Sequence, residues 1–209
     1  MIIQHQVGPV ATTASIAPGS QAPARAGALG DLIVSKFAPD LYEGCYRRQV
    51  FGASVQAARV TSVGLTLAYT GLILSNAPGN TVNAVVLNVG CAFPVAPAAV
   101  IILGLFTGYS TTAVTHTTAV TPRSLFYGVG ASPQCLVDES ATQPTAAFIT
   151  HVLGSVGTGA VTVANVTSGF YDLKGQVILP PGAWCGIYTS QVANTAGFLG
   201  SISWMELPI

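Results

Sequence analysis

The chain has 209 residues, which is enough for one domain with a well-buried core and an extra arm. Its formal net charge is zero, and charged residues make up 7% of it, against about 25% in ordinary soluble domains. These values exclude a nucleic-acid-binding face, which needs clustered Lys and Arg. Because a free monomer stays soluble through a charged coat, we expect either that other chains cover much of the surface or that the protein is a membrane protein.

Residues 1 to about 30 are rich in Ala, Pro, Gly, Ser and Thr and hold too few large apolar residues to form a core. This composition predicts an extended arm that pairs with a neighbour's sheet edge, or else a terminus without fixed structure. The first residues lack a positive stretch followed by an apolar one, so we expect no secretory signal.

Residues 31–59, which we call the collar, hold seven of the fourteen charged residues together with several aromatic ones. Tyr and Arg are the side chains that most often anchor protein interfaces. We therefore expect the collar to meet a partner, and the alternative is a solvated loop whose aromatic side chains belong to the core. The candidate interface residues are Phe37, Tyr42, Tyr46, Arg47, Arg48 and Phe51.

From residue 60 onward, short β-branched and apolar runs alternate with turns rich in Gly, Pro and Asn. The segments predicted to be strands are 63–75, 82–93, 100–107, 146–153, 160–166, 170–179, 183–189 and 198–207. Residues 108–145 are rich in Thr, Ser and Pro, with a short apolar island at 125–127. No segment has a helical period, so the sequence predicts an all-β protein: an antiparallel β-sandwich or jelly roll at 60–209, preceded by an extended N-terminal arm and collar at 1–59.

The window from Ala84 to Phe106 carries no charge and is long enough to cross a bilayer. Pro94 and Pro97 interrupt it, and β-branched residues lie on both sides of them. Two buried strands joined by a turn explain this pattern better than a membrane helix does. We therefore expect no membrane contact.

Residues that carry catalysis or bind metal are scarce and scattered. His5, His116 and His151 lack the spacing of a metal site with any other His, Cys or carboxylate. Asp138 and Glu139 are adjacent and would point to opposite faces of a strand. Motifs for a nucleophilic serine, a dinucleotide or a phosphate loop are missing. The sequence therefore predicts no catalytic residue, no metal and no cofactor, and a protein that is not an enzyme.

The four cysteines are spread widely, and each stands among apolar neighbours. They are Cys45, Cys91, Cys135 and Cys185. No pair has the close spacing of a zinc site. We expect four reduced, buried thiols in a protein that folds in a cytosol.

Three stretches resemble structural proteins of tailed bacteriophages. They are GDLIVS at 30–35 with YEGCYR at 42–47, GLTLAYTGL at 64–72 with SNAPG at 75–79, and ILPPGAW at 178–184 with the closing strand at 200–209. The resemblance implies a virion protein with a jelly-roll-like body and an arm. Capsid cement, or decoration, proteins of this kind bind the outside of the head lattice, often as trimers.

The leading hypothesis is therefore a capsid cement protein on the head surface of a virion that assembles in the host bacterial cytoplasm. Its partners would be the major capsid protein lattice and copies of itself, as a homotrimer. The alternatives are a tail-fibre or receptor-binding β-domain that binds a host surface ligand, a major shell subunit, and a hydrolase.

Overall fold

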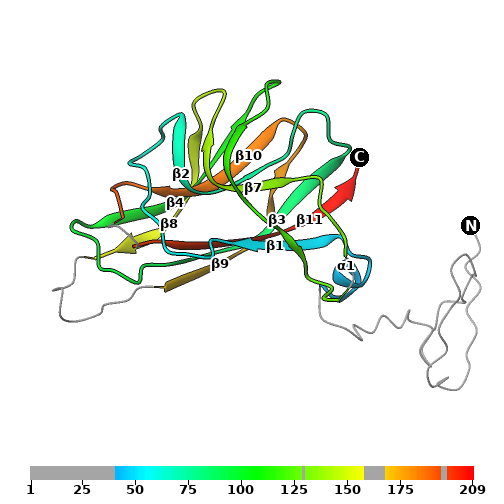
Figure 1. The fold of residues 1–209 in the computed structure, drawn as a ribbon, viewed down its shortest axis with the longest axis horizontal. Coiled ribbons are helices and arrows are strands. Elements are labelled where there is room, and N and C mark those ends of the chain that lie inside the picture. The colour runs from blue at the N-terminus through cyan, green and yellow to red at the C-terminus, as the bar shows by residue number, and fades with distance from the viewer. Residues whose placement is uncertain (1–40, 129, 158–167, 194–196) are drawn as a thin grey trace, which may run out of the picture. The chain divides into compact units, whose positions relative to one another are not determined.

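A computed structural model of the chain describes residues 41–128, 130–157, 168–193 and 197–209 (Figure 1). Residues Leu41–Ile209 form one compact unit. The predicted arm, the candidate residue Phe37 and the predicted strand at 160–166 lie outside the described residues.

The described residues form one short helix and eleven strands. The helix is α1 (Tyr42–Tyr46), and the strands that follow it are β1 (Val50–Ser54), β2 (Ala68–Ser75), β3 (Val82–Ala92), β4 (Ile101–Tyr109), β5 (Thr115–Val120), β6 (Arg123–Ser124), β7 (Leu136–Thr142), β8 (Phe148–Val156), β9 (Ser168–Leu179), β10 (Ala183–Thr189) and β11 (Leu199–Pro208). The window that was long enough to span a bilayer forms β3 and β4, as predicted. Within the described residues, no helix has the length and apolarity that crossing a membrane requires.

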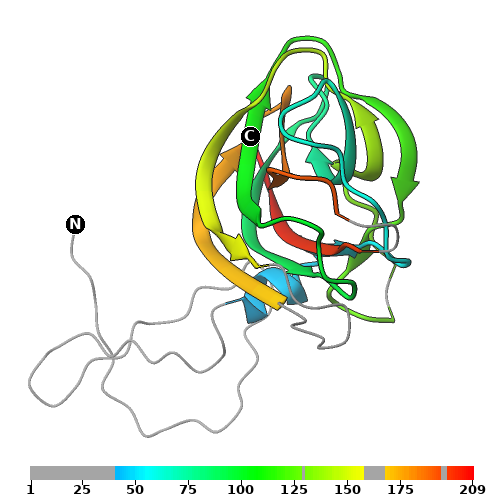
Figure 2. The same ribbon diagram turned by 90° about the vertical axis from the view of Figure 1, so that its left-hand side faces the viewer.

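The strands form two antiparallel sheets that pack face to face (Figures 1 and 2). One sheet has the order β6-β1-β11-β3-β9, and the other has the order β5-β7-β2-β10-β4-β8. Eight of the strands pair as a rolled hairpin: β1 with β11, β2 with β10, β3 with β9 and β4 with β8. This order is that of a jelly roll, so the predicted fold class is confirmed. Strands β5, β6 and β7 are an insertion that widens both sheets.

The body begins before residue 60, where the sequence placed its boundary. Strand β1 pairs with β11 along its whole length, and the side chain of Phe51 is buried in the core. Two further expectations are corrected. Residues 63–67 lie outside any strand, although their apolar side chains alternate, and 108–145 contain three strands that were not predicted. Four of the six residues of β5 are Thr or His and five are exposed, so a search for buried apolar runs passes over them.

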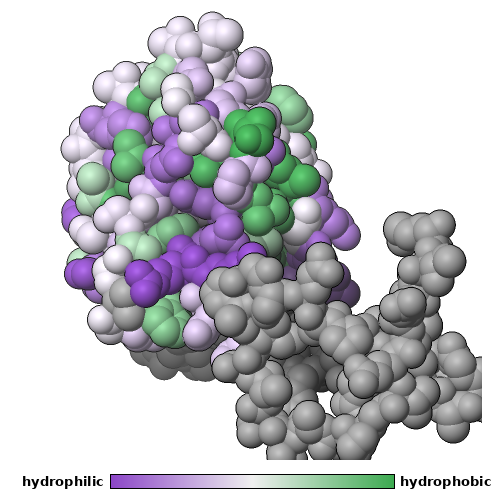
Figure 3. Space-filling model, turned by 90° about the vertical axis from the view of Figure 1, so that its right-hand side faces the viewer, coloured by the Kyte–Doolittle hydropathy of each residue, from purple (hydrophilic) through white to green (hydrophobic). Residues whose placement is uncertain are grey.

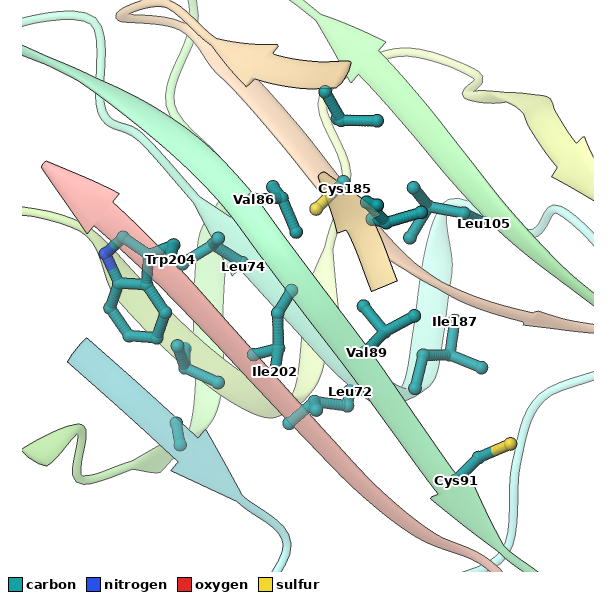
Figure 4. Close-up of a cluster of buried hydrophobic side chains, with 14 of the residues drawn as sticks. Leu72, Leu74, Val86, Val89, Cys91, Leu105, Cys185, Ile187, Ile202 and Trp204 are labelled. Carbon is teal, nitrogen blue, oxygen red and sulfur yellow. The ribbon is translucent and has the colours of Figure 1, made fainter. Parts of the chain in front are cut away.

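Both sheets direct apolar side chains into one core between them (Figure 4). Leu72 and Leu74 of β2 face Ile202 and Trp204 of β11 across this space. Burial of such side chains is the main force that holds two sheets together, because it removes apolar area from water. Alternation along each strand leaves the intervening side chains on the two outer faces.

On the outer face of the six-stranded sheet, aromatic rings lie over glycines of the neighbouring strand. Trp184 is the cross-strand partner of Gly108, and Phe106 is the partner of Gly186. A Cβ added at Gly108 would lie 2.3 Å from the Trp184 ring, and one at Gly186 would lie 2.5 Å from the Phe106 ring. The indole Nε1–H of Trp184 donates to Gln143 Oε1 at 2.9 Å. These glycines therefore make room for a second apolar layer outside the sandwich.

The edges of both sheets are irregular. Strand β6 has two residues, and the pairings of β5, β8 and β9 with their neighbours all contain register shifts. In β9, residues 173–176 lie opposite the single residue Leu87, and Lys174 and Gly175 adopt left-handed φ values of 50° and 72°. Bulged or short edges are poor templates for a strand from another chain. Contacts with other chains through these edges therefore have to use side chains.

Candidate interaction surface

Helix α1 brings together four of the six residues that the sequence proposed for an interface. The exposed rings of Tyr42 and Tyr46 stack, with centroids 6.1 Å apart and planes 12° apart. Phe126 meets Tyr46 edge-on at 6.0 Å. Arg47 and Arg48 follow the helix directly and are exposed. We call these five residues the tyrosine–arginine surface.

Helix α1 packs on the sheet through the side that carries a small residue, Gly44, and an apolar one, Cys45. Cys45 packs against a cluster on the outer face of the five-stranded sheet that includes Val50 and Met205. A Cβ added at Gly44 would lie 3.0 Å from Val50 and 3.1 Å from Met205, so glycine lets the helix approach closely. The tyrosines then face outward. Figure 3 shows this end of the molecule, where hydrophobic side chains lie between hydrophilic ones.

The interface prediction is wrong for Phe51. Its side chain is 3% exposed and lies in the core, with its ring 5.9 Å from that of Trp204. In β1, alternation sends Phe51 inward and its neighbours Val50 and Gly52 outward. The alternative of a core aromatic, which the sequence left open, holds for this residue.

The acidic side chains of the body are mostly buried. Asp138, Glu139 and Glu206 have less than a tenth of their surface exposed. Asp138 Oδ2 contacts Nδ1 of His116, and Glu139 Oε2 lies 2.8 Å from Nε of Arg59. Burial raises the pKa of the Asp138 carboxyl, and the contact with His116 offsets only part of that rise.

The basic side chains, in contrast, are exposed. Arg47, Arg48, Arg123 and Lys174 are all exposed, and Asp172 is the only exposed carboxylate among those whose side chains the structure describes. The surface of the described body is therefore more positive than the formal net charge of zero suggests. A partner that meets the tyrosine–arginine surface would match it best with carboxylates of its own.

A second surface lies on the side of the sandwich where β8 and β9 are the edge strands. Figure 2 shows these two strands running next to each other. Apolar side chains protrude from both strands; Val152 is 72% exposed and Phe148 is 61% exposed. Strand β8 has no Asp, Glu, Lys or Arg. We call the exposed apolar members the apolar side, which consists of Phe148, Ile149 and Val152 of β8 and Phe170 and Ile178 of β9. On β9, the exposed side chains of Asp172 and Lys174 lie between Phe170 and Ile178.

Sequence reasoning identified β8 and β9 as strands but did not predict that their side chains protrude. The absence of charge in 146–156 indicates a strand that is covered, either by the protein's own core or by a partner. Buried and partner-covered strands look alike in sequence. Only the sheet order, which places β8 and β9 at edges, separates the two cases.

The described part of the chain has few side chains of the kinds that bind metals or act in catalysis. No group of three or more His, Cys, Asp or Glu among them is placed to hold a metal ion. The pair of Asp138 and His116 has the form of a catalytic orienting pair. Within the described part of the chain, however, no hydroxyl or thiol is hydrogen-bonded to that imidazole.

The four thiols are free in this structure. Cys91, Cys135 and Cys185 are buried as predicted, whereas Cys45 is half-buried on the side of α1 that packs against the sheet. Burial raises the pKa of Cys91 to about 11 and that of Cys185 to about 12, so both thiols stay protonated at neutral pH.

Neither a scan against protein-family models nor searches of curated proteins and solved structures finds a match for this chain.

Proposed function

We propose that this protein is a structural component of a tailed-bacteriophage virion, a capsid cement protein that binds the outside of the head and holds neighbouring shell subunits together. Its partners are copies of itself, as a homotrimer, and the lattice of the major capsid protein. The jelly-roll body supports this proposal, because jelly rolls are common in the proteins of viral shells. Because one fold hosts many functions, the argument rests on the surfaces.

The apolar side carries the proposal. Monomeric soluble proteins rarely leave several large apolar side chains exposed next to one another, and such patches usually mark protein contacts. Val152 is 72% exposed on β8, which has no charged residue, and Phe170 is 71% exposed on β9. Since the edges of β8 and β9 are bulged, the contact uses side-chain packing and not strand addition. A second copy of this chain supplies the same uncharged β8 strand.

The tyrosine–arginine surface is the second contact and meets the shell lattice. Two stacked tyrosines provide contact area with little rotamer entropy to lose, and Arg47 and Arg48 pair with carboxylates of the lattice. A body with two different contact surfaces bridges subunits. Each interface of ordinary size buries about 800 Å² per partner, and repetition over the shell multiplies its effect.

The experiment compares self-association of the full chain with that of Val152→Asp and Ile178→Asp variants, measured by sedimentation at several concentrations. The wild-type chain is expected to be trimeric, and each variant to raise the dissociation constant by at least about 100-fold, because a carboxylate would be desolvated in the contact. Thr117→Asp, on the exposed edge strand β5, is the matched control and should leave the trimer intact. A wild-type chain that stays monomeric at every concentration contradicts the proposal.

A second function class, a receptor-binding domain of a tail fibre, is favoured by the exposed tyrosines at the α1 end. Electron microscopy of purified particles separates the two. Density for this chain at symmetry axes of the head supports the cement protein, and density confined to the tail supports receptor binding.

A further inference from the structure

One row of residues crosses the outer face of the five-stranded sheet, with a cation at one end and an anion at the other. Each member is the cross-strand partner of the next, from β6 through β1, β11 and β3 to β9. The row consists of Arg123, Gly52, Ser203, Asn88 and Asp172. The neighbouring row toward α1 is apolar and is covered in part by the helix. In the polar row, Ser203 is 8% exposed and the Leu125 side chain lies close to Gly52, whereas Arg123 and Asp172 at the two ends are exposed.

The Arg123 end of this row forms the floor of a hollow of about 290 Å³. The floor includes the small residues Gly52 and Ser203, the Leu125 side chain lies against Gly52, and Asn88 lies at the far side. Tyr127 borders the hollow on the β6 side and is 81% exposed. Since neighbouring strands lie about 4.8 Å apart, the floor from Arg123 to Asn88 spans about 14 Å.

The polar side chains around the hollow have hydrogen-bonding groups that are not used within the described residues. Among the described residues, none forms a hydrogen bond or ion pair with the guanidinium of Arg123 or with the side-chain amide of Asn88. Gln56 donates its amide N–H groups to Ser54, which leaves its Oε1 as an acceptor. The hollow therefore offers a cation, amide donors, amide acceptors and an exposed aromatic ring within one shallow site.

We propose that this hollow binds a saccharide that carries a carboxylate, such as a uronic acid residue. The planar guanidinium of Arg123 pairs with the carboxylate through two parallel hydrogen bonds. The ring of Tyr127 packs against the C–H face of the pyranose. Sugar hydroxyls both donate and accept hydrogen bonds, and the amides of Asn88 and Gln56 match them because amides do the same.

Other anionic ligands fit this arrangement less well. A nucleic acid would need several cations along its backbone, and the hollow has one. A free phosphate would leave the tyrosine and both amides unused. Asp172 lies at the other end of the row, beyond Asn88, where its carboxylate accepts the N–H of Lys174 at 2.9 Å. An anionic group is therefore directed toward the Arg123 end. The site does not depend on the proposed assembly.

The test is ligand-observed saturation-transfer NMR on the full-length protein, with D-glucuronic acid as the probe and glucose as the uncharged control. Glucuronic acid is expected to bind with a dissociation constant on the order of 1 mM, as suits a ligand of this size. Arg123→Gln should weaken this binding at least about 10-fold, to the level of glucose. Tyr127→Ala should remove saturation transfer to the ring C–H protons.

Two matched variants serve as controls. Lys174→Gln removes a cation elsewhere on the same sheet, and Tyr109→Ala removes a ring that is 61% exposed on the other sheet. Both should bind glucuronic acid as the wild-type chain does. Equal signals for glucuronic acid and glucose, or the same loss in Lys174→Gln as in Arg123→Gln, would overturn the assignment. Sedimentation measures self-association and does not depend on sugar binding. The binding test can therefore fail while the proposed assembly stands, and the assembly can fail while the binding site stands.

Discussion

The buried carboxylate of Glu206 offers a direct measure of how the insertion is attached to the jelly roll. Glu206 lies on β11, and its two carboxylate oxygens accept the backbone N–H groups of Gln134 and Cys135, each at 2.9 Å. Nε1 of Trp204 donates to the same carboxylate at 3.2 Å. Gln134 and Cys135 lead into β7 of the other sheet. One side chain therefore joins the two sheets at this end.

Glu206→Ala removes the acceptor of two backbone N–H groups at a buried position. An unsatisfied buried donor costs about 1–3 kcal/mol, so the free energy of unfolding should fall by about 4 kcal/mol. With a urea m-value of about 2 kcal/mol/M for a body of this size, the unfolding midpoint should fall by about 2 M. Glu206→Gln keeps one acceptor oxygen and should lose about half as much.

The assay is urea unfolding followed by circular dichroism at one fixed protein concentration, because self-association changes apparent stability. Asp172→Ala is the control: this exposed carboxylate accepts one backbone N–H, and its loss should cost about 1 kcal/mol or less. If the midpoint of Glu206→Ala moves no further than that of Asp172→Ala, the carboxylate does not join the sheets.

Three further outcomes are expected. Gly186→Ala should lower the free energy of unfolding by about 1–3 kcal/mol, since its methyl would overlap the Phe106 ring. Gly79→Ala, with open space around it, is the control and should change the free energy of unfolding by less than about 0.5 kcal/mol. Equal urea midpoints for the two variants would contradict this prediction. Because burial raises the pKa of Asp138, the folded state keeps a proton that the unfolded state has already lost. Stability should therefore fall as the pH rises from the ordinary carboxyl range through that raised pKa, and Asp138→Asn should remove this fall in a series of unfolding curves. In the native protein a thiol reagent should modify Cys45 at least about 100-fold faster than the three buried cysteines, and mass spectrometry showing uniform labelling would refute that.

Local sequence was enough to predict most of the strands that bury apolar side chains, although β1 was missed. Strands β3, β4 and β10 consist mainly of apolar residues bounded by Pro and Gly, so they were predicted within a few residues. Strand β7 was missed because it carries Asp138 and Glu139 in its centre. Those carboxylates are acceptable inside the protein only because His116 and Arg59 reach them from other segments.

Of the candidate surfaces, too, one could be predicted from local sequence and another could not. Tyr42, Tyr46, Arg47 and Arg48 are neighbours in sequence, so their composition alone suggested a common surface. The row from Arg123 to Asp172 depends on the register of five strands that come from distant parts of the chain. A shift of one residue in any pairing would turn these side chains to the other face. No local pattern encodes that alignment.

The pairing of β1 with β11 has a consequence for biosynthesis. The ribosome releases Val50 long before it adds Met205, its partner in the sheet. Until residues 199–208 have emerged, the nascent polypeptide holds several apolar segments with nothing to close against, a topology that is slow to fold and exposed to aggregation. We therefore expect the sandwich to close only after β11 has emerged from the ribosome, and chaperones to accompany the chain until then.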